Sequence, residues 1–242
     1  MPDLLPAADC GFDSLAASQA RRGALGVRLA GEDVVLLAER ALHWPRGAAL
    51  FVADVHLGKA AAFRAGGVPI PRGSTAADLA CLSALIERTE STRLVVLGDF
   101  VHAPQGRVPA LDTAVGAWRT RHADLAITLV RGNHDARAGD PPAAWRVEVV
   151  AAPGLLGPFV LHHAPAEPPT GYALAGHVHP GVRLQGARGE SVRLPCFVLR
   201  RRCAVLPAFG RLTGLAAVPV RPGETRVAIA GTMLHPLRAP AI

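Results

Sequence analysis

The sequence predicts an α/β domain in which two β-sheets pack face to face with helices on the outside. The first half of the chain alternates short apolar runs with helix-like segments, which is the pattern of βαβ units with parallel strands. The second half holds short strands separated by Gly and Pro, and no long linker divides the halves. With 242 residues, half of them hydrophobic, the chain can bury a large core in one domain.

The elements of the first half follow from apolar runs and helical spacing. Residues 1–25 lack periodicity, so we expect an N-terminal tail there, with the domain itself spanning 26–242. Continuous apolar runs predict buried strands within 49–55, 93–99 and 124–132. Helical spacing predicts helices within 57–66, 74–89 and 109–122.

The second half has a different texture, because long helical patterns are missing from it. Short runs rich in β-branched and aromatic residues alternate with turn residues and predict strands. These runs are "WRVEVV", "PFVLHH", "YALAGHVH", "VRLPCFVL", "RCAVLPAF" and "TRVAIAG". Both halves can therefore contribute a sheet to one sandwich.

Composition excludes several classes of protein. No apolar run approaches the roughly 18 residues that a membrane helix needs, and the N-terminus lacks the basic segment of a secretory signal, so we expect a cytoplasmic protein. The cysteines show no CxxC spacing, which argues against a disulfide framework or a zinc-thiolate site. The net charge of +7 suits a phosphate-bearing substrate, although the abundance of Arg over Lys is typical of a coding bias.

Metal-competent side chains follow five of the expected strands. The ends of strands in α/β sheets are where ligands gather, so these side chains should converge on one site. Gly98, Gly132 and Gly176 flank the clusters and would let the backbone approach a ligand closely. The candidates, in chain order, are Asp54, His56, Asp99, Asn133, His134, Asp135, His162, His163, His177 and His179.

The spacing of these residues favours a centre with two metal ions. Residues two apart in an extended segment share one face, so Asp54 can act with His56, and His177 with His179. The set contains more ligands than one ion can use, whereas two ions bridged by a carboxylate would use them all. Carboxylate, imidazole and amide ligands suit Mn²⁺, Fe, Zn²⁺ or Mg²⁺.

The motifs "DVH", "GDF", "GNHD", "HHAP" and "GHVH", in that order, resemble those of the calcineurin-like metallophosphoesterases. Four further stretches within residues 35–230 resemble the ligase-associated DNA damage response endonuclease branch: "HLGKAAAFRAGGVPIPRG", "GHVHPGV", "LPCFVLRRR" and "VLPAFGRLTG". The resemblance implies a four-layer α/β/β/α sandwich with two mixed β-sheets and flanking helices. It also implies a phosphodiesterase that acts on DNA in repair, beside an ATP-dependent DNA ligase and a helicase.

The resemblance also assigns roles to residues. One metal would be held by Asp54, His56 and His179, and the other by Asn133, His163 and His177. Asp99 would bridge the two metals, of which Mn²⁺ is the expected identity, and a water acidified by them would be the nucleophile. His163 is preferred to His162 because His163-Ala164-Pro165 fits the His-x-Pro form of the family motif. His134 would protonate the departing alkoxide, and Asp135 would orient His134.

Other residues and other functions stay open at the level of sequence. Lys59 and Arg64 could meet flanking DNA phosphates or could simply be solvated, and His102 could line the cleft or lie outside it. The same residues would serve a hydrolase of small phosphodiesters or nucleotide conjugates. A non-catalytic scaffold of the same fold is a third hypothesis, which the complete set of ligand types disfavours.

Overall fold

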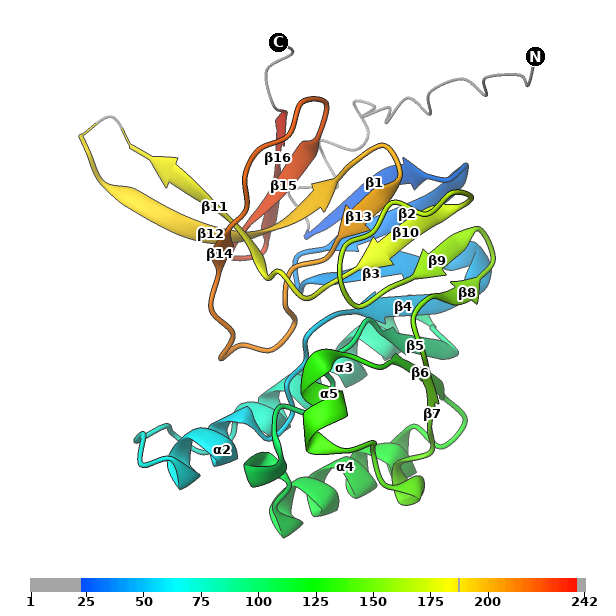
Figure 1. Ribbon diagram of the computed structural model, residues 1–242, viewed down its shortest axis with the longest axis vertical. Coiled ribbons are helices and arrows are strands. Elements are labelled where there is room, and N and C mark those ends of the chain that lie inside the picture. Colours follow the sequence, from blue (N-terminus) through cyan, green and yellow to red (C-terminus); the bar gives the residue numbers. More distant parts are fainter. Residues whose placement is uncertain (1–22, 187, 239–242) are drawn as a thin grey trace.

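The computed structural model describes residues 23–186 and 188–238 of the chain (Figure 1). Most of the predicted tail, residues 1–22, lies outside this range. Ala24 and Leu25, which the sequence placed in the tail, already belong to the first strand. No helix within the described ranges is long and apolar enough to cross a membrane.

The first sheet has seven strands, which lie side by side in chain order. Strands β1 to β4 pair antiparallel, and β4 to β7 pair parallel, so the sheet is mixed. The strands are β1 (Ala24–Leu29), β2 (Glu32–Leu37), β3 (Ala41–Trp44), β4 (Ala49–Val52), β5 (Arg93–Val96), β6 (Ala126–Val130) and β7 (Val147–Val150). Sequence analysis gave β4 to β7 and missed β1 to β3.

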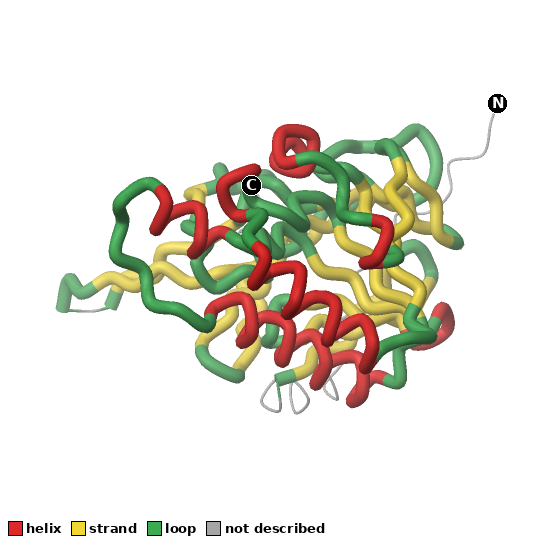
Figure 2. The backbone as a smooth tube through the Cα atoms, turned by 90° about the horizontal axis from the view of Figure 1, so that it is seen from below, coloured by secondary structure: helices red, strands yellow, loops and turns green. Residues whose placement is uncertain are grey.

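The helices cover one face of this sheet. Leu82, Leu85 and Trp118 pack with residues such as Leu50 and Leu129 in one buried cluster, and Figure 2 shows α3 and α4 lying side by side across the strands. The helices are α2 (Lys59–Ala65), α3 (Ser74–Thr89), α4 (Pro109–Arg121) and α5 (Asn133–Ala138), with short 3₁₀ turns η1 (Pro45–Gly47), η2 (Pro104–Gly106) and η3 (Ala143–Trp145). The first three α-helices were predicted, whereas the six-residue α5 was missed.

The second sheet has nine strands and is also mixed. Its path runs β14-β11-β12-β13-β10-β9-β8, and β15 pairs with both β12 and β16. The strands are β8 (Gly154–Leu156), β9 (Phe159–Leu161), β10 (Tyr172–Ala175), β11 (Pro180–Gln185), β12 (Ser191–Leu199), β13 (Cys203–Val205), β14 (Ala216–Ala217), β15 (Thr225–Ala230) and β16 (Met233–Arg238). All the predicted strands of this half are present, and β8, β11, β14 and β16 were not anticipated.

The main core lies between the two sheets. Phe51 from β4 contacts Phe159 from β9 edge to face, with ring centroids 5.9 Å apart. Phe197 and Leu97 belong to the same buried cluster, which draws residues from both sheets. Because each face buries its apolar side chains against the other sheet, the prediction of two packed mixed sheets with flanking helices is confirmed.

The outer face of the second sheet differs from the outermost layer of the expected four-layer sandwich. Small side chains such as Ala173, Cys203 and Ala228 form a buried cluster there. No helix occurs among the described residues after Trp145, and loops lie over this face instead. Arg226 donates a hydrogen bond to the carbonyl of Val218, which lies in one such loop. Small residues expose little apolar surface, so a loop layer is enough to cover them.

Candidate metal centre

Backbone hydrogen bonds join the segment that follows β4 to the one that follows β5, and the segment that follows β9 to the one that follows β10. The Asp54 amide donates to the Gly98 carbonyl at 3.1 Å, and the His56 amide donates to the Asp99 carbonyl at 2.9 Å. On the other sheet, the Gly176 amide donates to the His163 carbonyl at 2.9 Å. The predicted site residues of distant segments therefore meet at one edge of the sandwich, beyond the carboxyl ends of the strands.

Several of the candidate ligands have a left-handed backbone, which non-glycine residues rarely adopt. Their φ angles lie between 46° and 72°, and a conformation of this kind costs about 1–3 kcal/mol per residue. Strained backbone of this kind clusters at functional sites, where the surrounding structure holds it in place. The residues are Asp54, His56, Asp99, His177 and His179.

Two glycines make the close packing of this region possible. A Cβ atom on Gly98, whose φ is +84°, would lie 2.0 Å from Nδ1 of His163. A Cβ atom on Gly132 would lie 2.2 Å from Oδ1 of Asp99. The absence of side chains at these positions lets the candidate ligands approach one another.

Asp54, His56 and His179 form the first group of candidate ligands. One ligand atom from each lies within 4.8 Å of the others, and Oδ1 of Asp54 is 3.6 Å from Nε2 of His179. Oδ1 of Asp54, Nε2 of His56 and Nε2 of His179 are all buried, and none of them has a hydrogen-bond partner among the described residues. The other Asp54 oxygen accepts a hydrogen bond from the His177 amide at 2.8 Å, which fixes the carboxylate.

Asp99, His163 and His177 form the second group, and Asn133 lies beside them. Nε2 of His163 is 2.9 Å from Oδ1 of Asn133 and 3.0 Å from Nδ1 of His177. Nδ1 of His163 donates to the Leu97 carbonyl at 3.0 Å, so in the neutral ring Nε2 carries a lone pair. That lone pair faces the amide oxygen of Asn133, an arrangement that a cation between the two atoms would stabilise.

Asp99 lies between the two groups. Its Oδ1 is 3.5 Å from Nε2 of His163, and its Oδ2 is 4.0 Å from Nε2 of His56. The carboxylate is almost completely buried and also accepts a hydrogen bond from the His134 amide at 2.9 Å. Asp99 is therefore placed to serve both groups.

The donor atoms fit divalent metal ions. Buried polar atoms without partners are costly, and three of them in the first group point to one small volume. Burial, together with the nearby Lys59 charge, lowers the pKa of His56 to about 2, so its ring is neutral and its lone pair is available. Imidazole, carboxylate and amide donors without a thiolate suit Mn²⁺, Fe, Zn²⁺ or Mg²⁺.

His134 lies beside this centre and is held by His102. Nδ1 of His134 donates to the His102 carbonyl at 2.6 Å, and the two rings stack with centroids 4.8 Å apart. Nδ1 of His102 is in turn 3.2 Å from Nδ1 of His56. Burial is the main cause that lowers the pKa of His102 to about 4. The sequence left the role of His102 open, and its position soon after Asp99 at the end of β5 was the available signal.

The expectation that the Asp135 carboxylate orients the His134 ring is corrected by the structure. The buried Asp135 carboxylate accepts hydrogen bonds from the amides of Val101, at 2.9 Å, and Gly132, at 3.0 Å. Both oxygens therefore hold the backbone of neighbouring segments, and a carbonyl rather than a carboxylate orients the His134 ring. The backbone turn after Gly132 puts consecutive side chains on different sides of α5, which the sequence alone did not reveal.

The remaining candidates divide clearly. His162 belongs to neither group of candidate ligands, although it directly precedes His163. Arg64 is exposed and donates to the carbonyls of Ile70 and Pro71, so its guanidinium supports the loop after α2 instead of joining the cluster. Lys59 does lie at the site.

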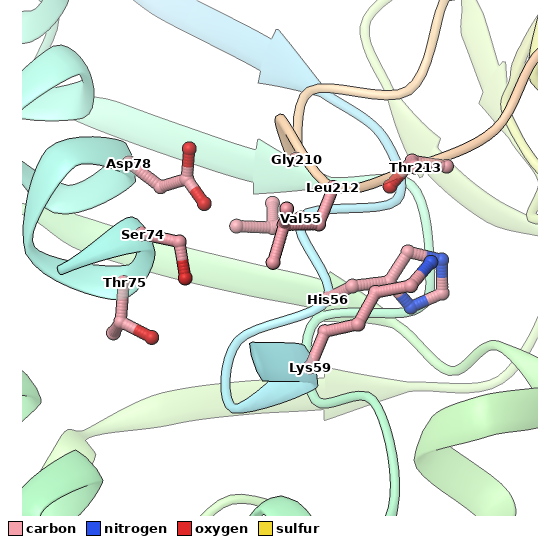
Figure 3. A pocket seen from close by; sticks show the side chains of 9 residues that line it. All are labelled: Val55, His56, Lys59, Ser74, Thr75, Asp78, Gly210, Leu212 and Thr213. Carbon is pink, nitrogen blue, oxygen red and sulfur yellow. The ribbon is translucent and has the colours of Figure 1, made fainter. Parts of the chain in front are cut away.

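Lys59 borders a small pocket beside the first group. The pocket is lined by residues of the β4–α2 segment, the start of α3 and the loop at 210–213. Figure 3 shows the Lys59 side chain running alongside the His56 ring. Partial burial lowers the pKa of Lys59, while the Asp54 and Asp99 carboxylates oppose this shift. Its ammonium is thus a cation at the rim of an acidic centre.

Two mixed sheets with carboxylates and imidazoles gathered at their strand ends define an enzyme of the metallophosphoesterase class. The solved structure of Pseudomonas putida nuclease MPE is 41% identical to this chain, with a TM-score of 0.78. The match covers 88% of this chain and 100% of that one. This chain therefore belongs to the calcineurin-like metallophosphoesterases, in their ligase-associated DNA damage response endonuclease branch.

A second solved structure, that of Yfce, a phosphoesterase from E. coli, is much less similar. It is 18% identical, the match covers 76% of this chain and 88% of that one, and the TM-score is 0.36. A likeness of this size carries no inference about this chain. No family model and no curated protein matches the chain.

Proposed function

We propose that this protein is a metal-dependent endonuclease that hydrolyses phosphodiester bonds of DNA at a dinuclear centre. The observation that supports this most strongly is the position of Asp99, whose two oxygens face His163 of one candidate ligand group and His56 of the other. A carboxylate between two sets of ligands is the arrangement that two adjacent ions require. We assign the activity to one domain that begins at β1, because a single core joins both sheets.

In this proposal each ion takes its ligands from both sheets. Asp54, His56 and His179 hold the first ion, and Asn133, His163 and His177 hold the second, with Asp99 bridging them. Divalent ions at these positions, of which we propose Mn²⁺, would supply positive charge to a phosphodiester and lower the pKa of water. The residues themselves supply a rigid frame, since their positions are fixed by backbone hydrogen bonds and by left-handed turns.

We assign His134 the handling of the leaving oxygen. Its Nδ1 is occupied by the His102 carbonyl, so Nε2 is the ring atom that can carry a proton to a departing alkoxide. Asp135 is a positioning residue, because its carboxylate fixes the backbone at Gly132 and at Val101. Lys59, at the rim of the centre, is assigned to a phosphate of the substrate strand.

The choice of DNA as substrate is supported by the relative and by charge. The 41% identical structure is that of a nuclease, and the chain here carries a net charge of +7. When a basic protein binds a polyanion such as DNA, the release of counterions from the polyanion favours binding. We also propose, from the family, a role in DNA repair beside an ATP-dependent DNA ligase and a helicase.

Hydrolysis assays test the proposal. We expect Mn²⁺-dependent cleavage of bis(p-nitrophenyl) phosphate, weaker cleavage of the monoester, cleavage of single-stranded or nicked DNA, and loss of all three after chelation. His163→Ala should lose activity, while His162→Ala, one position away and outside both ligand groups, serves as the matched control. Cleavage of the diester without DNA would favour a small phosphodiester as substrate. Absence of hydrolysis in protein that holds two metal ions would contradict an enzymatic role.

A further inference from the structure

The hairpin formed by β11 and β12 projects from the body of the protein (Figure 1). Every described residue from Arg183 to Arg193 is exposed to solvent. The hairpin begins at Pro180, directly after His179 of the first ligand group. The His179 carbonyl accepts a hydrogen bond from the Ala216 amide at 2.9 Å, so the base of the hairpin is anchored at the candidate metal centre.

The register of the hairpin separates two chemically different faces. Arg183 lies opposite Arg193, while Leu184 lies opposite Val192. Since side chains alternate along a strand, the arginines share one face and the apolar pair shares the other. Glu190 is on the apolar face, where its carboxyl group lies over Gly186. The arginine face of the described hairpin therefore contains no acidic residue.

The paired arginines are a feature that folding alone does not explain. Like charges directly opposite each other on antiparallel strands are destabilising. Neither guanidinium forms an ion pair with a carboxylate within the described chain, and the hydrogen bond that Arg183 makes is to Oγ of Ser191, at 3.1 Å. Two exposed forks of N–H donors thus stand close together without an anion, and this is the donor geometry that phosphate oxygens accept.

We propose that this hairpin is an arm that binds the sugar–phosphate backbone of a nucleic-acid strand through Arg183 and Arg193. The proposal rests on the proposed nuclease function and names the surface that holds the substrate away from the scissile bond. Charge complementarity selects this partner, because a bound phosphate would relieve the repulsion between the arginines. Arg183 is four residues beyond His179, a distance of about 13 Å along a strand, which corresponds to roughly four phosphate spacings of B-form DNA.

The test compares two charge-matched double variants. Arg183→Gln/Arg193→Gln removes the arginine pair, and Arg28→Gln/Arg201→Gln removes two exposed arginines elsewhere. Arg28 is on β1, and Arg201 follows the end of β12 that is remote from the hairpin tip. The primary readout is the Kd of the Mn²⁺-loaded protein for a fluorescein-labelled single-stranded oligonucleotide with phosphorothioate linkages, which resist hydrolysis, measured by anisotropy over a salt series. The second readout is hydrolysis of bis(p-nitrophenyl) phosphate.

We expect the hairpin variant to bind DNA about 10-fold more weakly than wild type near physiological salt, with a shallower salt dependence. Its kcat/KM for the small diester should equal that of wild type, and its thermal midpoint should be equal or higher because a like-charge pair is gone. The control variant retains both hairpin arginines, so its affinity for DNA should depend on salt as that of wild type does.

Wild-type affinity and salt dependence in the hairpin variant would overturn the proposal. So would a loss of DNA binding that is equal in both double variants, since that reports net charge and not the arm. The binding comparison is independent of cleavage. If wild-type protein leaves DNA intact, the nuclease proposal fails, while the anisotropy result still decides whether the hairpin binds nucleic acid.

Discussion

The two groups of candidate ligands differ in whether their ligand atoms have hydrogen-bond partners within the protein. In the first group, Oδ1 of Asp54 and the Nε2 atoms of His56 and His179 are buried without hydrogen-bond partners in the described chain. In the second group, Nε2 of His163 contacts both Asn133 and His177, and His177 is exposed to solvent. The same types of residue thus form one group whose ligand atoms are buried without hydrogen-bond partners, and one more exposed group whose members contact one another.

This difference teaches that the first group depends more strongly on a bound ion. A buried polar atom without a partner costs about 1–3 kcal/mol, and a cation would remove that cost at three atoms together. In the second group, Nδ1 of His177 can donate a hydrogen bond to Nε2 of His163 when no ion is present, since the two imidazoles contact each other. We therefore expect the first position to bind metal more tightly than the second.

Asp99→Asn should have the largest effect, because it removes the carboxylate that lies between the two groups. The carboxylate serves both groups, so we expect a loss of phosphodiesterase activity of about 1000-fold or more and a metal content below that of wild type. Steady-state kinetics and elemental analysis of the same preparation measure both. Wild-type activity with full metal content would exclude Asp99 as the residue that joins the groups.

His134→Ala tests a residue that touches the centre without belonging to either group. Loss of its proton transfer should reduce kcat by about 10²–10⁴-fold, and the metal content should stay at the wild-type level. His122→Ala is a control, because that ring contacts Ser83 and Trp118 away from the centre. If His134→Ala empties a metal position, then His134 is a ligand and our division of roles is wrong.

Titration with a chelator measures the contrast directly. We expect the Mn²⁺-loaded protein to release its ions in two steps, with affinities that differ by about 10–100-fold. His177→Ala should weaken the weaker step further, so that activity is recovered only at high Mn²⁺, whereas His179→Ala should weaken the tighter step. Two ions released in a single step, with the same effect of both substitutions, would show that the two positions are equivalent.

Asp78→Asn has the smallest expected effect. It tests whether burial beside the first group raises the pKa of the Asp78 carboxyl in the folded protein. Asp78 lines the pocket beside His56, and burial raises its pKa to about 6 despite the neighbouring Arg211. An acid whose pKa is raised on folding favours the folded state at low pH and loses this contribution as the pH rises through about 6. Relative to wild type, the variant should therefore gain about 1–2 kcal/mol of unfolding free energy between pH 4.5 and 7.5.

Urea denaturation at the two pH values measures this change. Glu148→Gln, a substitution on β7 away from the pocket, is the control and should show no comparable gain. A difference between Asp78→Asn and wild type that is constant with pH would contradict a raised pKa in the folded protein.

Much of the site could be predicted from the sequence, because its residues follow apolar runs that form buried strands. Asp54 and Asp99 follow β4 and β5, which pair in parallel, so their convergence is a consequence of topology. His163 was preferred over His162 from the family motif, and it is His163 that lies beside the other candidate ligands. The metal ligands themselves remain proposals that the experiments above test.

Other features depend on tertiary contacts that a single sequence does not reveal. Strand β1 was missed because Leu25, Val27 and Leu29 alternate with polar or small residues in a stretch too short to stand out from a tail. Asp135 lies next to His134 in sequence, yet its oxygens hold amides of other segments. Arg64 is five residues beyond Lys59 on α2, but its long side chain donates to carbonyls of the loop that follows the helix.

The left-handed backbone at the candidate ligands implies a trade-off between the stability of the fold and the presence of metal-binding side chains. Glycine adopts that conformation without strain, so glycine at His177 or His179 would relieve about 1–2 kcal/mol of backbone energy while it deletes an imidazole. Histidine at these two positions therefore lowers the stability of the fold, in exchange for two imidazoles at the candidate metal centre.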